Sequence, residues 1–149
     1  MPISDLKGKT VMIAEGNPNQ SLLPSLKQEL TEQGATVVVS QHSPRDPKNV
    51  SLISEEIANH QPKIDALIVH DLDTSLPSSQ IAAVALAKKF KDTLPVVVHD
   101  WNDDMRVTQS IENAGAKYLD FDAPNGKVTF AVADAIAQHG KPGRSVGGT

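Results

Sequence analysis

Carboxylates and imidazoles follow four short apolar runs of this sequence, and these residue types could do chemistry. They are Glu15, His70-Asp71, His99-Asp100, Asp120 and Asp122. Neighbouring carboxylates repel one another, which raises some of their pKa values unless a cation lies between them. Oxygen ligands of this kind suit a hard divalent ion such as Mg²⁺. One prediction is therefore a metal site formed by Glu15, Asp71 and Asp100, and the other is a solvated acidic edge without a metal.

The two His-Asp steps permit another interpretation. Two imidazoles and a carboxylate can hold a transition metal. Successive side chains of a strand point to opposite faces of a sheet, however, so each histidine and the aspartate after it would be separated. We therefore favour a structural role, with His70 and His99 partly buried and hydrogen-bonded to nearby backbone.

Composition and motifs exclude several other functions. The chain has no cysteine, which excludes disulfides, thiolate metal sites and cysteine nucleophiles. It has no G-x-S-x-G elbow and no P-loop, so we expect no enzymatic turnover. Its formal net charge is −4 and it has no cluster of lysine and arginine, which argues against a nucleic-acid partner.

The elements that must position these side chains are five runs rich in β-branched residues, separated by helical stripes. The runs are apolar nearly throughout, which is typical of parallel strands covered on both faces. They span residues 10–14, 35–40, 65–69, 94–98 and 116–121. The stripes are Leu22-Leu26-Leu30, Val50-Ile53-Ile57, Ile81-Val84-Ala85, Val107-Ile111-Ala114 and Val128-Val132-Ala135-Ile136.

This order predicts a flavodoxin-like (βα)₅ three-layer sandwich, with a parallel five-stranded sheet of order 2-1-3-4-5. Its functional crevice would lie beyond the carboxyl ends of the strands, beside the first strand. We expect one domain over residues 1–139 and a flexible glycine-rich tail or linker over 140–149. We find no signal-peptide pattern and no membrane-length apolar run, so we expect a cytoplasmic protein with no membrane contact.

Residues 11–20, VMIAEGNPNQ, resemble the opening of a response-regulator receiver domain, closest to the receivers of hybrid histidine kinases. Residues 64–69 resemble the third receiver strand, 94–98 the fourth, and 115–119 the approach to the fifth. The resemblance covers roughly residues 6–138. It implies a signalling module in which an acidic pair holds Mg²⁺ and an aspartate that ends the third strand accepts a phosphoryl group.

The residues that this chemistry needs are mostly replaced. Glu15 matches the first acid of the pair, but Gly16 stands at the second position. The phosphoacceptor position falls on His70, and Asp71 follows one residue later. Asp71 and His70 are therefore both candidates for that position.

The remaining pocket positions also differ from the residues of the family. Asp100 stands where the family has Ser or Thr, Phe121 stands where it has Lys, and Asp122 replaces the following Pro. An anion or an apolar ring beside an incoming phosphate would cost several kcal/mol in a partly desolvated pocket. The resemblance therefore implies a degenerate receiver, or pseudo-receiver, and no cofactor unless Mg²⁺ binds the acidic edge.

Our leading expectation is a non-catalytic signalling or interaction domain. The resemblance implies that it binds a protein partner or a second copy through a face formed by residues 105–115, 116–121 and 127–139. Trp101 and Tyr118 are the candidate contact residues on that face. The first alternative is an atypical Mg²⁺-dependent receiver that uses Asp71, with Mg²⁺ held by Glu15 and by Asp100 or Asp73.

The second alternative is a Rossmann-like module that binds a small ligand or nucleotide. Residues 5–10, 32–39 and 63–69 are similar to segments of short-chain dehydrogenases. The glycine-rich phosphate turn and the Tyr-x-x-x-Lys pair of those enzymes are missing, so this reading implies binding without dehydrogenase activity.

Overall fold

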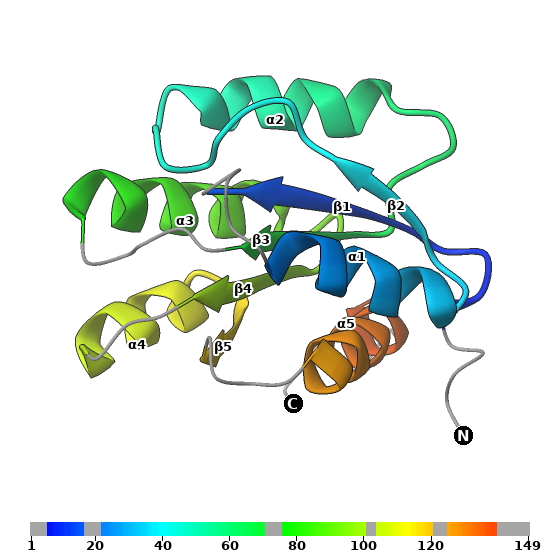
Figure 1. Ribbon diagram of the computed structural model, residues 1–149. Coiled ribbons are helices and arrows are strands. Elements are labelled where there is room, and N and C mark those ends of the chain that lie inside the picture. The colour runs from blue at the N-terminus through cyan, green and yellow to red at the C-terminus, as the bar shows by residue number, and fades with distance from the viewer. Residues whose placement is uncertain (1–5, 17–21, 71–75, 101–103, 121–124, 140–149) are drawn as a thin grey trace.

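The chain forms one parallel five-stranded sheet with a helix after each strand (Figure 1). The computed structural model describes residues 6–16, 22–70, 76–100, 104–120 and 125–139. The strand order is β2-β1-β3-β4-β5, which confirms the predicted flavodoxin-like topology. The strands are β1 (Thr10–Glu15), β2 (Thr36–Val39), β3 (Ala66–His70), β4 (Val96–Asp100) and β5 (Lys117–Asp120).

The helices cover both faces of this sheet and complete the three layers. α1 and α5 lie together on one face, and α2, α3 and α4 lie on the other (Figure 1). Their bounds are α1 (Leu22–Glu32), α2 (Asn49–Asn59), α3 (Pro77–Phe90), α4 (Met105–Asn113) and α5 (Asn125–His139). None of the helices in the described ranges is long and apolar enough to cross a membrane.

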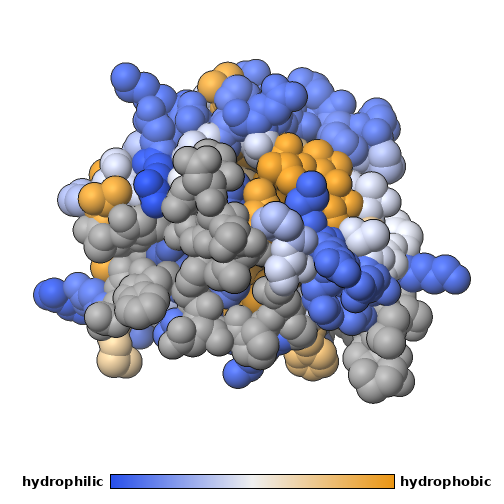
Figure 2. Space-filling model, viewed as in Figure 1, coloured by the Kyte–Doolittle hydropathy of each residue, from blue (hydrophilic) through white to orange (hydrophobic). Residues whose placement is uncertain are grey.

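The inner strands are apolar on both sides because each side meets a different core. In β1, Val11 and Ile13 pack with α1 and α5, whereas Met12 and Ala14 pack with α2, α3 and α4. All residues of β1, β3 and β4 are buried. The edge strand β2 is less covered. Figure 2 shows an apolar area right of centre in the upper half of the visible surface.

The predicted buried stripe of α3 is wrong. Ile81 is exposed, and Val84 and Ala85 are half-buried. The helix instead turns Ala82, Ala83 and Leu86 toward the sheet. Apolar residues occur around most of α3, so their spacing alone did not determine which side packs on the sheet, whereas the small alanines allow the helix to approach the strands closely.

Three strand ends also lie later in the chain than predicted. β1, β3 and β4 end at Glu15, His70 and Asp100, whereas the predicted runs end at residues 14, 69 and 98. The ladders continue past the apolar residues, since His70 pairs with Glu15 on one side and with His99 on the other. The two histidines and Asp100 are therefore part of the sheet rather than of the loops that follow it.

Gly34 follows α1 in the left-handed conformation that is common just after a helix, with φ +100°. A Cβ at this position would lie 2.9 Å from the Cα of Lys7, which is a backbone atom. We expect Gly34→Ala to lower the free energy of unfolding by about 2 kcal/mol, because the left-handed backbone and the clash both oppose a side chain. Urea denaturation measures this change.

Gly8→Ala is the matched control for this prediction. Gly8 also has a positive φ, +78°, but no atom lies within 4 Å of an added Cβ. We expect about 1 kcal/mol of destabilisation from the backbone alone. Equal losses in the two variants would contradict the role of the Lys7 contact.

Candidate functional site

The carboxyl ends of three adjacent strands bring Glu15, His70 and His99 into one row. Glu15 of β1 is in register with His70 of β3, and His70 is in register with His99 of β4. Side chains alternate along a strand, so these three lie on the same face as Ile13, the face that α1 and α5 cover. Sequence positions that are 55 and 29 residues apart therefore meet at one edge of the sheet.

The strongest contact in this row is a buried hydrogen bond between Glu15 and His70. Nδ1 of His70 lies 2.6 Å from Oε1 of Glu15, and the two side chains are 0% and 3% exposed. A carboxylate oxygen can only accept, so we assign Nδ1–H of the imidazole as the donor. In a site with little water such a bond is strong, and either group would be costly to bury alone.

His99 lies beside this pair. Its ring centroid is 5.2 Å from that of His70, with the two planes tilted by 47°. Only 1% of His99 is exposed, so both imidazoles belong to the interior rather than to an open rim. The predicted structural role of the histidines agrees with this burial, although the partner found for His70 is a carboxylate side chain and not backbone.

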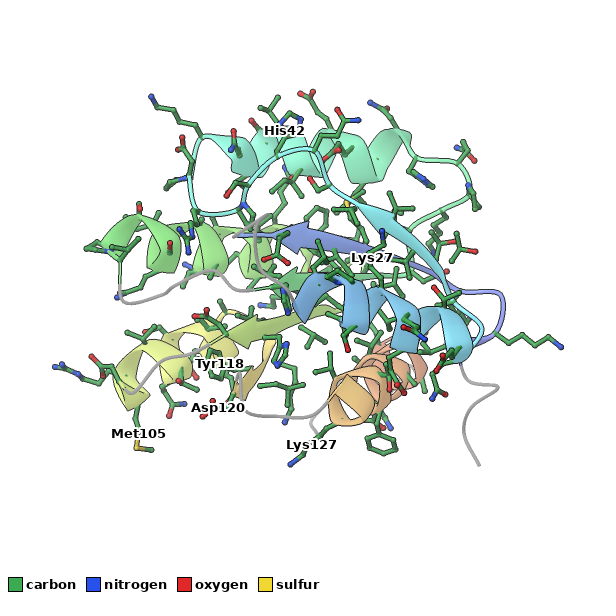
Figure 3. The ribbon with its side chains drawn as sticks, in the orientation of Figure 1. Lys27, His42, Met105, Tyr118, Asp120 and Lys127 are labelled. Atoms are coloured by element: carbon green, nitrogen blue, oxygen red, sulfur yellow. The ribbon has the colours of Figure 1, made fainter. Side chains whose placement is uncertain are left out.

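Asp100 follows His99 in β4 and points to the opposite face of the sheet, the side of Val98. It is completely buried, and its backbone carbonyl accepts a hydrogen bond from the Tyr118 hydroxyl at 3.0 Å. Asp120 of β5 is in register with Asp100 and is exposed. Figure 3 labels Tyr118 and Asp120 close together on β5.

The described residues do not assemble the predicted metal ligands. Glu15 and Asp100 lie on opposite faces of the sheet, and the Glu15 carboxylate already accepts a hydrogen bond from His70. No group of three or more His, Cys, Asp or Glu in the described ranges is placed to hold a metal ion. Asp71, the third predicted ligand, lies outside those ranges, so a Mg²⁺ site that includes it stays a prediction.

Several other predicted site residues also lie outside the described ranges, namely Trp101, Phe121 and Asp122. Gly16 lies inside them. It is buried, and its N–H donates to the carbonyl oxygen of His70 at 2.7 Å. Gly16 therefore extends the contact between β1 and β3, and it brings no side chain to the edge.

A charged pair marks the start of α4. The Asp104 carboxylate accepts a hydrogen bond from the Arg106 backbone N–H at 2.9 Å and thus caps the helix. Its side-chain hydrogen bonds with the Arg106 guanidinium lower the pKa of Asp104 and raise the pKa of Arg106. Asp104 is therefore ionised at neutral pH.

The sequence interpretation missed the pairing of Glu15 with His70. The signal was present, because both residues end apolar runs that the predicted order places on adjacent parallel strands. Recognising this pairing required the exact register of the two strands. The predicted strands ended one residue before Glu15 in β1 and one residue before His70 in β3, so neither residue was placed in the sheet.

Comparisons of sequence found no relative of this chain: no protein-family model matches it, and no characterised protein matches it. Comparisons of structure gave clear matches. Full-length FixJ from B. japonicum matches 93% of this chain with a TM-score of 0.68 and 13% identity, and the chain spans 63% of FixJ.

Two further structures match over nearly their whole length. A response regulator from Thermotoga maritima has a TM-score of 0.63 and 18% identity, with 87% of this chain and 98% of that chain covered. The signal receiver domain of an HD domain-containing protein from Pseudomonas fluorescens has a TM-score of 0.64 and 15% identity, with coverage of 88% and 96%. This chain therefore has the fold of response-regulator receiver domains.

Proposed function

We propose that this chain is a receiver-like signalling domain that acts through protein contacts and does not accept phosphoryl groups in the ordinary receiver manner. A cytoplasmic location and the absence of enzymatic turnover belong to the same proposal. The fold supports the receiver-like part, because it positions a functional edge at the carboxyl ends of β1, β3 and β4.

The observation that carries this proposal is the Glu15–His70 hydrogen bond. In the resemblance described above, Glu15 stands at a Mg²⁺-holding position and His70 at the phosphoacceptor position. Here the two side chains bind each other at 2.6 Å with almost no exposure. A carboxylate that accepts a hydrogen bond from a buried imidazole is a poor ligand for Mg²⁺, and a buried imidazole is a poor target for a phosphodonor.

We further propose that the face formed by α4, β5 and α5 binds a partner protein. Met105 at the start of α4 is 83% exposed, and Phe130 of α5 is 59% exposed. Met105, Asp120 and Lys127 lie along one side of the molecule in Figure 3. Tyr118 is half-buried there and uses its hydroxyl internally, so it supports the face more than it offers a polar contact.

Phosphorylation tests the proposal directly. We expect wild-type protein incubated with Mg²⁺ and a small acyl phosphate to show no added phosphoryl group by intact mass. We also expect no Mg²⁺-dependent change in melting temperature, because ligand binding to the folded state would raise it. Glu15 is already engaged by His70, which is the physical reason for both expectations.

Asp71→Asn and Asp73→Asn are the paired controls for this experiment. An adduct on wild type that disappears in Asp71→Asn and persists in Asp73→Asn would contradict the proposal. The chain would then be an atypical but working phosphorylation switch that uses Asp71. Stabilisation by nucleotides without any adduct would instead favour a small-ligand module.

A further inference from the structure

The two edges of the sheet differ in their protection against pairing with another strand. At one edge, β5 contains the exposed charged side chains of Lys117 and Asp120. The Glu112 carboxylate also accepts a hydrogen bond from the Tyr118 N–H of this strand at 3.3 Å. Charges and covered N–H groups are common protections of an edge strand. At the other edge (Figure 1), β2 consists of one threonine and three valines and contains no charged residue.

The backbone of β2 presents hydrogen-bonding groups on its outer side. The N–H groups of Thr36 and Ser40 donate inward, to carbonyl oxygens of β1 and of the residue before it, each at 2.8 Å. Successive residues of a strand turn their backbone groups to alternate sides, so those of Val37 and Val39 point away from β1. In the described ranges β2 pairs with β1 alone. The outward N–H and C=O groups of these two valines are therefore open to a second strand.

This open stretch ends at the next outward residue on each side. The N–H of Ala35 donates to the Leu30 carbonyl oxygen at 3.1 Å. The N–H of Gln41 donates to the Glu56 carboxylate at 3.0 Å. Among the described residues of this edge, a partner strand therefore finds open outward N–H groups on the two valines alone.

The side chains of β2 suit a pairing between strands. Val37, Val38 and Val39 are half-buried, whereas every residue of the inner strand β1 is buried. They are β-branched, which favours packing against the side chains of a neighbouring strand. An uncharged and unprotected edge of such residues is a template for a second strand.

We propose that β2 pairs with β2 of a second copy of this chain, antiparallel and about a two-fold axis at Val38. An interface of this symmetry uses one surface twice and must complement itself. The axis places Val37 opposite Val39 of the second copy, and residues paired in this way exchange both of their N–H···O=C bonds. Every outward group of the two valines is then bonded. Each cross-strand pair is valine against valine, so no charge enters the interface.

A second copy fits this edge better than a long extended peptide of another protein. It offers two open residues at the same spacing, whereas a longer peptide would meet N–H groups that are already bonded. A stable interface buries about 800 Å² on each partner, and this short strand buries less, so we expect a weak dimer with a dissociation constant of about 100 μM or above. The inference goes beyond the proposed function, because β2 lies at the edge opposite β5 and leaves the α4–β5–α5 face available.

Amide hydrogen exchange followed by NMR tests the pairing in the wild-type protein. We expect the Val38 amide, which points toward β1, to be protected at every protein concentration. The Val37 and Val39 amides should exchange rapidly in dilute protein and should slow at least about threefold in the millimolar range, where sedimentation velocity should show dimer. Protection of all three amides at every concentration would overturn the proposal, because another part of the chain would then cover this edge.

Two substitutions of Val39 form a matched pair. Val39→Pro removes one outward N–H from each copy, and so half of the proposed hydrogen bonds, while the bonds to β1 are kept. We expect it to raise the dimer dissociation constant at least about tenfold. Val39→Ala shortens the side chain but keeps the N–H, so it should raise the constant by a smaller factor. Far-UV circular dichroism should show the same fold in both variants.

Met105→Asp, on the α4–β5–α5 face, should leave the dimer intact, and a dimer that it disrupts would contradict the use of β2. A monomer at all concentrations would overturn the proposal, as would a dimer in which the Val37 and Val39 amides exchange as fast as in the monomer. A synthetic peptide of residues 35–41, ATVVVSQ, tests the other occupant. Protection of the two amides by this peptide, without any dimer, would replace the second copy by a strand of another chain. The proposed function would survive each of these results.

Discussion

Replacing either Glu15 or His70 by leucine is expected to lower the free energy of unfolding by about 3–5 kcal/mol at neutral pH. Each replacement leaves the other polar side chain buried without the 2.6 Å hydrogen bond that it now makes. The loss is large because a buried group cannot recover its hydration. Equilibrium urea denaturation of the two single variants measures it.

The double variant, Glu15→Leu with His70→Leu, measures how much of each loss comes from the interaction between the two side chains. Replacing both partners by apolar residues leaves neither polar group buried, so we expect this variant to recover most of the stability lost in each single one. If each single variant loses about 3–5 kcal/mol and the double variant less than about 1.5 kcal/mol, the coupling energy of the cycle is at least about 4 kcal/mol in magnitude. Additive losses would show that the two side chains do not act as a pair.

Two further variants complete this experiment. Glu55 is exposed on α2, and Glu55→Gln should change stability by less than about 0.5 kcal/mol. Glu15→Gln keeps an oxygen that can accept from His70, so we expect a smaller loss than in Glu15→Leu. It also keeps the comparison usable should a leucine variant fail to fold.

Leu86→Ala is expected to destabilise the protein by about 2–5 kcal/mol, and Ile81→Ala by less than about 0.5 kcal/mol. Leu86 is completely buried against the sheet, so its loss leaves a cavity in the core beneath α2, α3 and α4. Ile81 is 59% exposed and buries little apolar surface. Urea denaturation of the two variants measures both changes in the free energy of unfolding.

This pair of variants decides between two orientations of α3. The apolar stripe of the sequence, Ile81-Val84-Ala85, would place Ile81 in the core and would make its truncation the more harmful one. A larger loss in Ile81→Ala than in Leu86→Ala would therefore contradict the observed helix orientation.

The fold was largely predictable because its signals are local. The runs of β-branched residues are covered on both faces, and the glycine at position 34 has the positive φ that is common just after a helix. Parallel order and right-handed connections then leave few topologies. Strand boundaries were less predictable, because a ladder can continue through polar residues such as His70 and His99 when their partners are buried with them.

The sequence predicted where in the fold the candidate site lies, but it did not predict which side chains contact one another there. By itself the sequence determined which residues end the strands, and hence that Glu15, His70, His99 and Asp100 gather at one edge. Only the tertiary structure decided that Glu15 binds His70 while Asp100 turns to the other face. The reason is that register and side-chain alternation are set by pairing between distant strands, so one residue of offset changes which groups meet. The same holds for α3, where packing against the sheet, and not helical periodicity, decided which apolar side was buried.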